Sequence, residues 1–402
     1  MLKELGPGLV TGAADDDPSG VATYTIAGAQ SGYQLLWVAL VTWPLMASVQ
    51  LMCAHISMAS QLSLTNAFLK KFSRKTVMIL VLALFVANML NVAADLSAMA
   101  DAVGLLTGYN SAIYVIVFGC AITAAMILLT YKQIARVLTW MTFFLLAYIL
   151  TALQTKTDWS ALRHGTFGPS WPQNKADWSI IVALLGTTIS PYLFFWQASQ
   201  EIEEMHKKKF FNFKLTEKIR NIDILLGTFI SNLIMYSIIL TAANSLHANG
   251  ITNIESSRQA AQALEPLLGS AAVFCYTFGL LGVGLLAIPT LVGSASFAVA
   301  EIFHWQSGLD KKWYQAKAFY MFLTVSMIVA MGIDFAKINP IKALFYSSIL
   351  NGLLSPVLII ACLLVATDKA LMNKKMLSPV SKFLVFITAL LMTLAAAAMF
   401  IV

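Results

Sequence analysis

Three consecutive aspartates, Asp15 to Asp17, stand in the first apolar stretch of the chain, directly before Pro18. A carboxylate in the middle of a bilayer costs about 2.5–3.5 kcal/mol on insertion scales, so three in a row require water, a cation or a partner. Because Pro18 interrupts helical hydrogen bonding, Asp17 is expected at the end of a broken helix, beside carbonyl groups without helical partners. Carboxylate and carbonyl oxygens together suit a hard divalent cation. For Asp15 and Asp16 the alternative is the wall of a water-filled vestibule.

A second proline interrupts a later apolar stretch at Ser190-Pro191. Unwound backbone at membrane depth is tolerated only where it is buried or lines a wet cavity, so two facing breaks predict a site near the midplane. Asp95, in the third apolar stretch, is expected to complete this site directly or through a water; the alternative is a hydrogen-bonded contact between helices. Asp101 lies six residues further on, about 120° around a helix, and is expected on another face.

The composition places most of the chain in lipid. Of its 402 residues, 59% are hydrophobic and 11% are charged, whereas an average soluble domain has roughly 25% charged residues. The net charge of +7 lies in short basic clusters between apolar stretches, a pattern that orients a membrane protein and does not indicate binding to nucleic acid. The sequence contains neither a nucleophile–base spacing nor an HExxH motif, so an enzyme is not predicted.

Eleven apolar segments are long enough to cross a bilayer. They lie near residues 7–30, 34–58, 76–107, 111–130, 134–156, 178–204, 221–247, 268–303, 316–332, 341–367 and 381–402. Clusters of Lys and Arg follow the even-numbered segments, which predicts a multi-pass protein of the plasma (inner) membrane with a cytoplasmic amino terminus and an external carboxyl terminus.

The segments divide into two halves, about 5–156 and 178–367, and each half opens with a helix that proline interrupts. Five plus five consecutive spans have opposite topologies, as inverted-repeat transporters do. The predicted fold is an all-α polytopic membrane protein, a single transmembrane domain over 1–402 with a LeuT-like five-plus-five inverted repeat and about eleven helices, of which the first and sixth are broken. The segment near 381–402 is then an accessory helix.

The first apolar stretch resembles the first helix of the Nramp metal-ion transporters, whose motif reads Asp-Pro-Gly-Asn. Here Gly6-Pro7-Gly8 is followed by Asp17-Pro18-Ser19-Gly20 and then by Ala22-Thr23. The resemblance covers roughly residues 5–365. The other matching stretches are Gly186 to Tyr192 in the place of the family's Met-Pro-His motif, Asn232 at an asparagine of the seventh helix, and Leu264 to Gly269 before the eighth.

The chain departs from the family pattern at ligand positions. Ser190 stands where the resemblance implies a methionine sulfur, Gly20 where it implies an asparagine, and Tyr192 where it implies a histidine. With fewer and harder protein ligands, a cation would keep part of its water shell, which suits Mg²⁺ because this ion dehydrates reluctantly. The substitutions resemble the branch of Nramp-related magnesium transporters.

The resemblance also bears on proton coupling. Family members that symport protons use the histidine of the sixth helix and an acidic pair in the third, whereas this chain has Tyr192, and Val92 with Asp95, at those places. Tyrosine titrates near 10 and cannot replace histidine near neutral pH. The sequence therefore predicts uptake that is uncoupled, or only weakly coupled, to protons.

Seven residues are predicted to surround the transported ion, at the two helix breaks and on the third and tenth helices. They are Asp17 as the main charged ligand, Ala14 and Thr187 as carbonyl donors, Ser190 and Gly20 as determinants of selectivity for a hydrated ion, Asp95 as an outer-shell carboxylate, and Asn351 as a contact to hydration water. Ser348 is closer than Asn351 to the family's tenth-helix ligand by strict register. No catalytic residue and no cofactor are predicted. The expected partners are the divalent ion and the lipid bilayer; protein partners stay open.

Two further polar groups stand near the cytoplasmic ends of segments. Glutamates at 201, 203 and 204 precede the basic run Lys207 to Lys209; the prediction is a salt-bridged surface, and the alternative is an exit funnel for the cation. His55 is isolated in sequence and is predicted to be a satisfied packing residue rather than a ligand.

Taken together, these patterns predict a transporter that moves Mg²⁺, and also Mn²⁺, inward by alternating access. A first alternative is a proton-coupled Mn²⁺ or Fe²⁺ importer of the same family, against which Ser190 and Tyr192 argue. A second alternative, from another class, is an Na⁺-coupled symporter of an organic solute such as an amino acid. The three clustered aspartates would repel the carboxylate of such a substrate.

Overall fold

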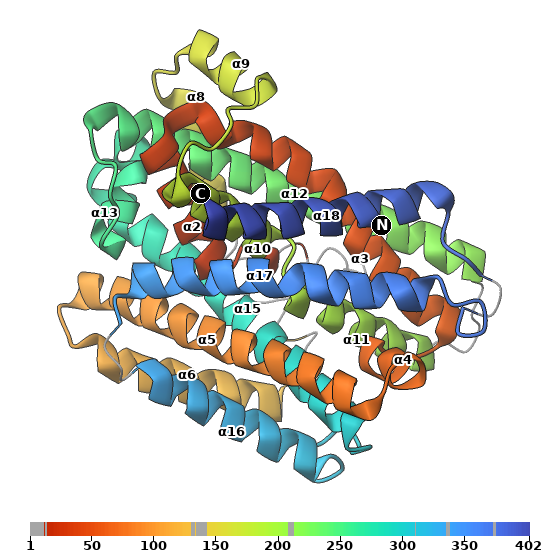
Figure 1. The fold of residues 1–402 in the computed structure, drawn as a ribbon. Helices are drawn as coiled ribbons and strands as arrows, with labels where there is room; N and C mark the ends of the chain where they lie inside the picture. The colour runs from red at the N-terminus through yellow and green to blue at the C-terminus, as the bar shows by residue number, and fades with distance from the viewer. Residues whose placement is uncertain are drawn as a thin grey trace.

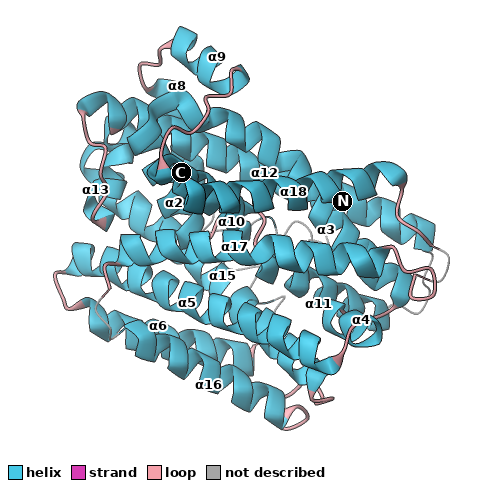
Figure 2. Ribbon diagram, viewed as in Figure 1, coloured by secondary structure: helices cyan, strands magenta, loops and turns pink. Residues whose placement is uncertain are grey.

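The computed structural model describes residues 12, 14–129, 133, 143–207, 213–309, 311–334, 338–372 and 375–402. Within these ranges every regular element is a helix (Figure 2). Nine helical stretches of the described chain are long and apolar enough to cross a membrane. The first of them, Pro18–Ser60, holds two helices. The Gly6-Pro7-Gly8 stretch, Lys208-Lys209 and residues 134–142 of the predicted segment 134–156 lie outside the described residues.

Eleven long helices build the body of the described chain: α2 (Pro18–Ser31), α3 (Leu36–Ser60), α5 (Arg74–Thr107), α6 (Ser111–Leu128), α10 (Lys175–Thr188), α11 (Pro191–Lys207), α12 (Phe213–Ser245), α15 (Ala272–Ile302), α16 (Lys317–Asp334), α17 (Pro340–Ala366) and α18 (Pro379–Ile401). Shorter helices join them: α4 (Leu64–Lys71), α8 (Leu146–Gln154), α9 (Trp159–Phe167), α13 (Ser257–Ala261) and α14 (Glu265–Leu268). Single 3₁₀ turns are η1 (Gly32–Leu35), η2 (Phe143–Leu145), η3 (His247–Asn249), η4 (Gln262–Leu264) and η5 (Gly269–Ala271).

The first helix occupies the centre of the bundle. α2 packs against α12, α17 and α10, while α5 packs against α15 and α17. In Figure 1, α5, α6 and α16 lie side by side, α17 runs next to α5, and α18 lies on the other side of α17. Because α2 is covered on several sides, all its residues from Pro18 to Ala29 are buried. A polar group at its start is therefore surrounded by protein.

Both predicted helix breaks are present. Ala14 and Asp15 are helical, Asp17 is extended (φ −64°, ψ 170°), and α2 begins at Pro18. Proline favours the first position of a helix, where its missing N–H group is not needed. In the same way α10 ends at Thr188 and α11 begins at Pro191, so only Ile189 and Ser190 separate the two halves of the predicted sixth span.

Glycines let two pairs of helices, α10 with α17 and α2 with α12, meet backbone to backbone. A Cβ atom added at Gly186 of α10 would lie 2.0 Å from the carbonyl oxygen of Ser348, and one at Gly352 of α17 would lie 2.3 Å from that of Val182. A Cβ at Gly28 of α2 would lie 2.2 Å from the carbonyl oxygen of Ile239. Small residues at helix contacts are typical of membrane bundles because they permit such approach.

The connections after even-numbered segments meet at one end of the bundle. Lys71 Nζ lies 2.6 Å from Asp368 Oδ2, which joins the end of α4 to the loop after α17. The Arg74 guanidinium donates a hydrogen bond of 3.1 Å to the carbonyl oxygen of Ile302 at the end of α15. His55 contacts Glu217 and the backbone of Lys375, so its prediction as a satisfied residue is confirmed.

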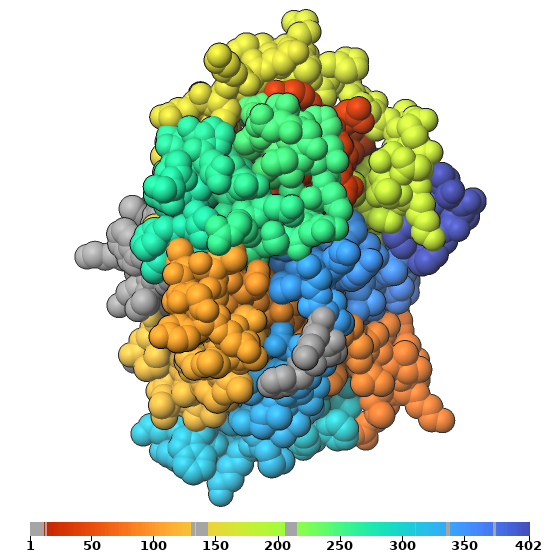
Figure 3. Space-filling view, turned by 90° about the vertical axis from the view of Figure 1, so that its left-hand side faces the viewer, coloured from red at the N-terminus to blue at the C-terminus, as the bar shows by residue number. Residues whose placement is uncertain are grey.

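The opposite end carries α9, α13 and the carboxyl terminus (Figure 1). Tyr33, in the turn η1 between α2 and α3, donates a hydrogen bond to the side chain of Asn244 at the end of α12. Asn339 donates a hydrogen bond of 2.8 Å to the carbonyl oxygen of Glu255. Figure 3 looks at this end: the green segment that follows α12 covers much of the face, and only a small part of the red first helix and its turn is visible.

Candidate functional site

The Asp17 carboxylate lies where the two helix breaks meet, and only 1% of the residue's surface is exposed. Its Oδ1 atom accepts hydrogen bonds of 2.7 Å from the Gly20 amide and 2.7 Å from the Ser19 hydroxyl, both in the first turn of α2. The Thr187 hydroxyl, at the end of α10, approaches the same oxygen to 3.4 Å. Asp17 therefore caps α2 and faces the other break at once.

Asn91 of α5 connects this carboxylate to two other predicted residues. Its side-chain amide nitrogen donates a hydrogen bond of 2.9 Å to Asp17 Oδ2 and lies 3.3 Å from Asp95 Oδ2. Its amide oxygen accepts from the Asn351 side chain at 3.5 Å. Sequence reasoning did not single out Asn91. Its spacing of four residues from Asp95, which places both on one helix face, was the available signal.

Five of the seven predicted residues thus share one hydrogen-bonded group, which we call the central cluster: Asp17, Gly20, Thr187, Asp95 and Asn351, joined by Asn91. Asp95, Asn351 and Asn91 are each at most 1% exposed. Asp95 Oδ1 and Asn351 Oδ1 are buried without a hydrogen-bond partner. A buried oxygen left unpaired costs about 1–3 kcal/mol, so these atoms are the ones that a cation, or water bound to it, would satisfy.

The other two predicted residues have partners within the breaks. The Ser190 hydroxyl lies 2.6 Å from the carbonyl oxygen of Gly186 and 2.9 Å from that of Thr187, so it closes the end of α10. The carbonyl oxygen of Ala14 accepts a hydrogen bond of 3.0 Å from the Tyr192 hydroxyl. The group of Thr187 that faces Asp17 is its hydroxyl. The two carbonyl oxygens predicted as ligands, those of Ala14 and Thr187, thus each accept a hydrogen bond from a hydroxyl group.

The two tenth-helix candidates are separated by the structure. Ser348 accepts a hydrogen bond of 3.0 Å from the Thr23 hydroxyl and lies 3.5 Å from the carbonyl oxygen of Ser19, so it packs along α2. Asn351, one turn further along α17, reaches the central cluster through Asn91. Of the two, Asn351 is the one hydrogen-bonded into the cluster.

The donor set of the central cluster consists of carboxylate, amide and hydroxyl groups. None of the side chains that hydrogen-bond Asp17 carries sulfur or imidazole. Across the described part of the chain, no three His, Cys, Asp or Glu side chains come together as metal ligands. A metal ion at Asp17 would therefore have to draw on hydroxyl, amide and carbonyl oxygens, and on its own water.

Asp15 and Asp16 point to a different partner from Asp17. The Ser231 hydroxyl of α12 lies 2.5 Å from Asp15 Oδ2 and 3.2 Å from Asp16 Oδ1. The neighbouring Asn232, which the resemblance singled out, accepts a hydrogen bond of 2.8 Å from Thr42 of α3 instead. Sequence reasoning missed Ser231, since a serine inside an apolar helix carries no distinctive signal.

The glutamates at the end of α11 form a buried ion network. Arg220 of α12 makes ion pairs with Glu201, with Glu204 at 2.8 Å and with Asp223 at 2.6 Å, and its own side chain is 5% exposed. The prediction of salt bridges is confirmed for Glu201 and Glu204, but the predicted surface position was wrong for Glu201, whose side chain is 1% exposed. Glu203 accepts a hydrogen bond from the Leu309 backbone. Among the described residues, the basic partner of Glu201 and Glu204 is Arg220. The sequence analysis considered only the lysines next to the glutamates and so did not identify it.

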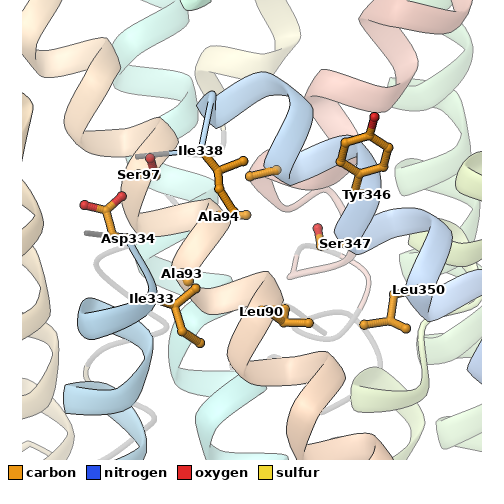
Figure 4. A pocket seen from close by; sticks show the side chains of 11 residues that line it. Leu90, Ala93, Ala94, Ser97, Ile333, Asp334, Ile338, Tyr346, Ser347 and Leu350 are labelled. Carbon is orange, nitrogen blue, oxygen red and sulfur yellow. The ribbon is translucent and has the colours of Figure 1, made fainter. Parts of the chain in front are cut away.

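Two described cavities lie near these elements. One of about 620 Å³ is at the end where α4, α11 and α15 meet, and its lining includes Glu203, Glu301 and Asn66. A smaller crevice of about 140 Å³ separates α5 from α17 (Figure 4). Ala94 and Ser97 of α5 line it, so the crevice lies on a different face of α5 from the face that carries Asn91 and Asp95.

Comparisons with known proteins agree with this architecture. The chain is 27% identical over 96% of its length, and 89% of the relative's, to the divalent metal cation transporter MntH of Caldanaerobacter subterraneus subsp. tengcongensis. A manganese transporter of Eremococcus coleocola superposes with a TM-score of 0.76 at 19% identity, covering 97% of this chain and 84% of the other. Mhp1, a nucleobase-cation-symport-1 family transporter, gives 0.58 at 15% identity, covering 98% and 91%.

These likenesses confirm the predicted polytopic, LeuT-like membrane fold. They also confirm that the chain is a transporter and not an enzyme, since the relatives that match along most of it are transporters. A family model described as natural resistance-associated macrophage protein-like, or Nramp, matches residues 8–402. This chain, in which the first helix is broken at Asp17 and capped by the same residue, is therefore a member of the Nramp family.

Proposed function

We propose that this protein carries hard divalent cations across its membrane by alternating access, Mg²⁺ above all and Mn²⁺ as well, without obligatory proton coupling. The observation that carries the proposal is the position of Asp17: a buried carboxylate at the meeting of two helix breaks, with oxygen-bearing and amide partners only. Transport of divalent metals agrees with the names of the relatives, one of which is a manganese transporter. No cofactor is needed, and the metal ion is the substrate.

The preference for Mg²⁺ rests on the donor set. Ser190 offers no soft sulfur, and its hydroxyl is held by the end of its own helix. Mg²⁺ binds through a few oxygen ligands while it keeps several waters. Asp95 and Asn351, which approach Asp17 through Asn91, would then contact the hydration shell rather than the ion. Softer metals gain less from such a site because it lacks the ligands that they prefer.

The absence of obligatory proton coupling rests on Tyr192. Its hydroxyl donates to the Ala14 carbonyl, and no histidine takes part in the hydrogen bonds of the central cluster in the described chain. An imidazole, the side chain that accepts and releases protons near neutral pH without a shifted pKa, is therefore not among the recorded partners of the cluster. The alternative of a proton-coupled Mn²⁺ or Fe²⁺ importer would need such a group.

An organic-solute symporter is disfavoured by charge. The likeness to Mhp1 concerns the fold alone. Asp15, Asp16, Asp17 and Asp95 are all buried around the first helix break, and an anionic substrate there would meet like charges at short range. A cation is attracted by the same groups.

The proposed orientation has the amino terminus in the cytoplasm and the carboxyl terminus outside. Lys71 and Arg74 lie at the end of the bundle opposite to α9, α13 and the carboxyl terminus. Short loops rich in Lys and Arg stay on the cytoplasmic side. Ions would then enter from the end that carries α9 and leave toward α4.

Uptake by the purified protein in proteoliposomes tests the proposal. Mg²⁺, Mn²⁺ and Ca²⁺ influx is measured for the wild type, Asp17→Ala, Ser190→Met, and Asp101→Asn as a control outside the cluster. We expect Mg²⁺ uptake in the wild type, none in Asp17→Ala, a shift toward Mn²⁺ in Ser190→Met, and wild-type behaviour in Asp101→Asn. Unchanged Mg²⁺ uptake in Asp17→Ala would remove Asp17 from the site. Internal acidification that scales with Mg²⁺ uptake would overturn the uncoupled mechanism.

A further inference from the structure

The first helix break gathers four buried carboxyl groups, which in their ionised form carry more charge than one divalent ion balances. Asp15, Asp16, Asp17 and Asp95 are each at most 1% exposed. No ion pair with a basic side chain is recorded for any of the four within the described ranges. Buried charges in proteins are paired, bound to metal or neutralised. One divalent ion at Asp17 balances two of the four carboxylates and leaves two.

Asp15 and Asp16 have a recorded hydrogen-bond partner that does not belong to the central cluster. Their recorded partner is Ser231 on α12, whereas Asp17 contacts α5 and α10. The Ser231 hydroxyl is 1% exposed and has a single proton, yet a carboxylate oxygen of each aspartate lies within 3.2 Å of it. It can donate fully to only one of them.

A second observation concerns the other oxygen of Asp15. Asp15 Oδ1 is buried and has no hydrogen-bond partner, although the residue is 0% exposed. An ionised carboxylate can accept about four hydrogen bonds or metal contacts, and the recorded contact of Asp15 is the one to Ser231 at Oδ2. This free oxygen, the shared hydroxyl and the facing Asp16 carboxylate supply three hard donor groups at one place.

We propose that Asp15, Asp16 and Ser231 bind a second divalent cation, separate from the ion at Asp17. Two carboxylates match the charge of one divalent ion, and their oxygens with the serine hydroxyl form a donor set of the kind that Mg²⁺ and Mn²⁺ accept. The ion links the short helical segment before Pro18 to α12, which are also joined by the Ser231 contacts and by the close approach of Gly12 to Gly227. The inference extends the proposed function, because it adds a site and does not alter the role of Asp17.

The test counts bound ions on the full chain in lipid nanodiscs. Equilibrium dialysis against Mn²⁺, and separately against Mg²⁺, is followed by elemental analysis of metal and protein. We expect two ions per wild-type chain, one in the double variant Asp15→Asn/Asp16→Asn, one in Asp17→Asn, and two in the control Asp101→Asn. Monodisperse elution and an unchanged circular dichroism spectrum identify variants that have folded.

Ser231→Ala keeps the test decisive if the double variant does not fold. It removes one neutral donor, so we expect the second ion to bind with a dissociation constant raised roughly tenfold, comparable to the loss of one supporting contact at a metal site. The affinity of the first ion should be unchanged. Equal weakening of both ions would show that the two aspartates and Asp17 form one site and would overturn the inference.

Other outcomes separate this inference from the proposed function. One ion per wild-type chain together with Mg²⁺ transport would overturn the second site and leave the function intact, as would two ions in the folded double variant. Two ions without any Mg²⁺ transport would leave the second site and overturn the function. One divalent ion whose binding tightens only when Na⁺ is added would assign Asp15 and Asp16 to Na⁺, against the inference.

Discussion

The hydroxyl of Tyr192 donates a hydrogen bond of 3.0 Å to the carbonyl oxygen of Ala14, so the start of α11 is tied to the last helical residues before the first break. This contact joins the two broken helices across the middle of the protein. It also occupies a carbonyl group that would otherwise face the ion. In the proposed mechanism, the two side chains that matter most are therefore Asp17, which would attract the ion, and Tyr192, which would limit its backbone ligands.

Replacing Tyr192 by histidine should make transport sensitive to pH. Histidine titrates near 6.5 when unperturbed, so a protonated imidazole beside four carboxylates would compete with the cation at low pH. We expect Mg²⁺ uptake by Tyr192→His to fall between about pH 7.5 and pH 5.5, while the wild type changes little. The measurement is initial influx as a function of pH with equal pH on both sides.

Tyr192→Phe is the matched control for that experiment. It removes the hydroxyl donor without adding a titratable group, so it should lower stability by about 1 kcal/mol through the lost hydrogen bond but leave the pH profile flat. A pH dependence of the same size in Tyr192→Phe would trace the effect to the unpaired Ala14 carbonyl and contradict the role given to imidazole.

Asn91→Ala should weaken ion binding although Asn91 carries no charge. Its amide orients Asp17 and Asp95 at once, and loss of such a supporting contact at a metal site typically reduces affinity 10–100-fold. We expect the KM for Mg²⁺ to rise roughly tenfold or more. The control is Asn88→Ala, three residues earlier, because Asn88 donates to Leu291 and Ser294 of α15 and does not contact the cluster. Equal effects of the two variants would indicate general damage to α5.

Gly186→Ala should destabilise the protein through the contact of α10 with α17. The added methyl group would lie 2.0 Å from the Ser348 carbonyl oxygen, and backbone atoms cannot move aside as a flexible side chain would. Overpacking of this kind costs about 1–3 kcal/mol, occasionally more. Thermal unfolding in detergent should show a lower Tm. Gly332→Ala, in α16, is the control, since an added Cβ there meets no atom within 4 Å; a comparable loss of Tm in this variant would rule out the steric explanation.

Arg220→Met should be among the most destabilising single substitutions at the α4 end of the bundle. It would leave Glu201, Glu204 and Asp223 without their common cation in a largely buried position. Removal of one partner from a buried ion pair costs about 3–5 kcal/mol. Partial recovery of Tm in the double variant Arg220→Met/Glu201→Gln would support this cause. If the second substitution lowers Tm further instead, the loss lies in packing of the long arginine side chain.

The sequence was sufficient for the helices and the breaks because their signals are local. Apolar length places a span near 341–367, and α17 runs from Pro340 to Ala366. Pro18 and Pro191 mark the breaks because proline cannot continue a helix from within. Asp17 was identified because a charge inside an apolar run is rare enough to stand out.

The site residues that could not be predicted from the sequence owe their role to contacts between helices that are distant in the chain. Asn91 and Ser231 are ordinary polar residues in apolar runs, and their importance comes from which aspartate each one meets. Ser190 was expected to face the ion, whereas its hydroxyl turns to its own helix end, a choice between local partners that composition does not reveal. Arg220 lies sixteen residues beyond Glu204, so a reading of adjacent charges pointed to the lysines in between.

The Asp17 side chain that caps α2 is also the proposed ligand of the ion, so the helix start and the ion would share one carboxylate. Asp17 Oδ1 holds the Gly20 amide and the Ser19 hydroxyl, which stabilises the first turn of the helix. A cation that bound the same oxygen would compete with the Gly20 amide and the Ser19 hydroxyl for its lone pairs. Ion binding would therefore weaken the hydrogen bonds that hold the first turn of α2. Because α2 packs against α10, α12 and α17, loosening or tightening its first turn would change how its start is held among these helices. Binding of an ion at Asp17, as proposed, would thus act on the anchoring of α2 through its first turn.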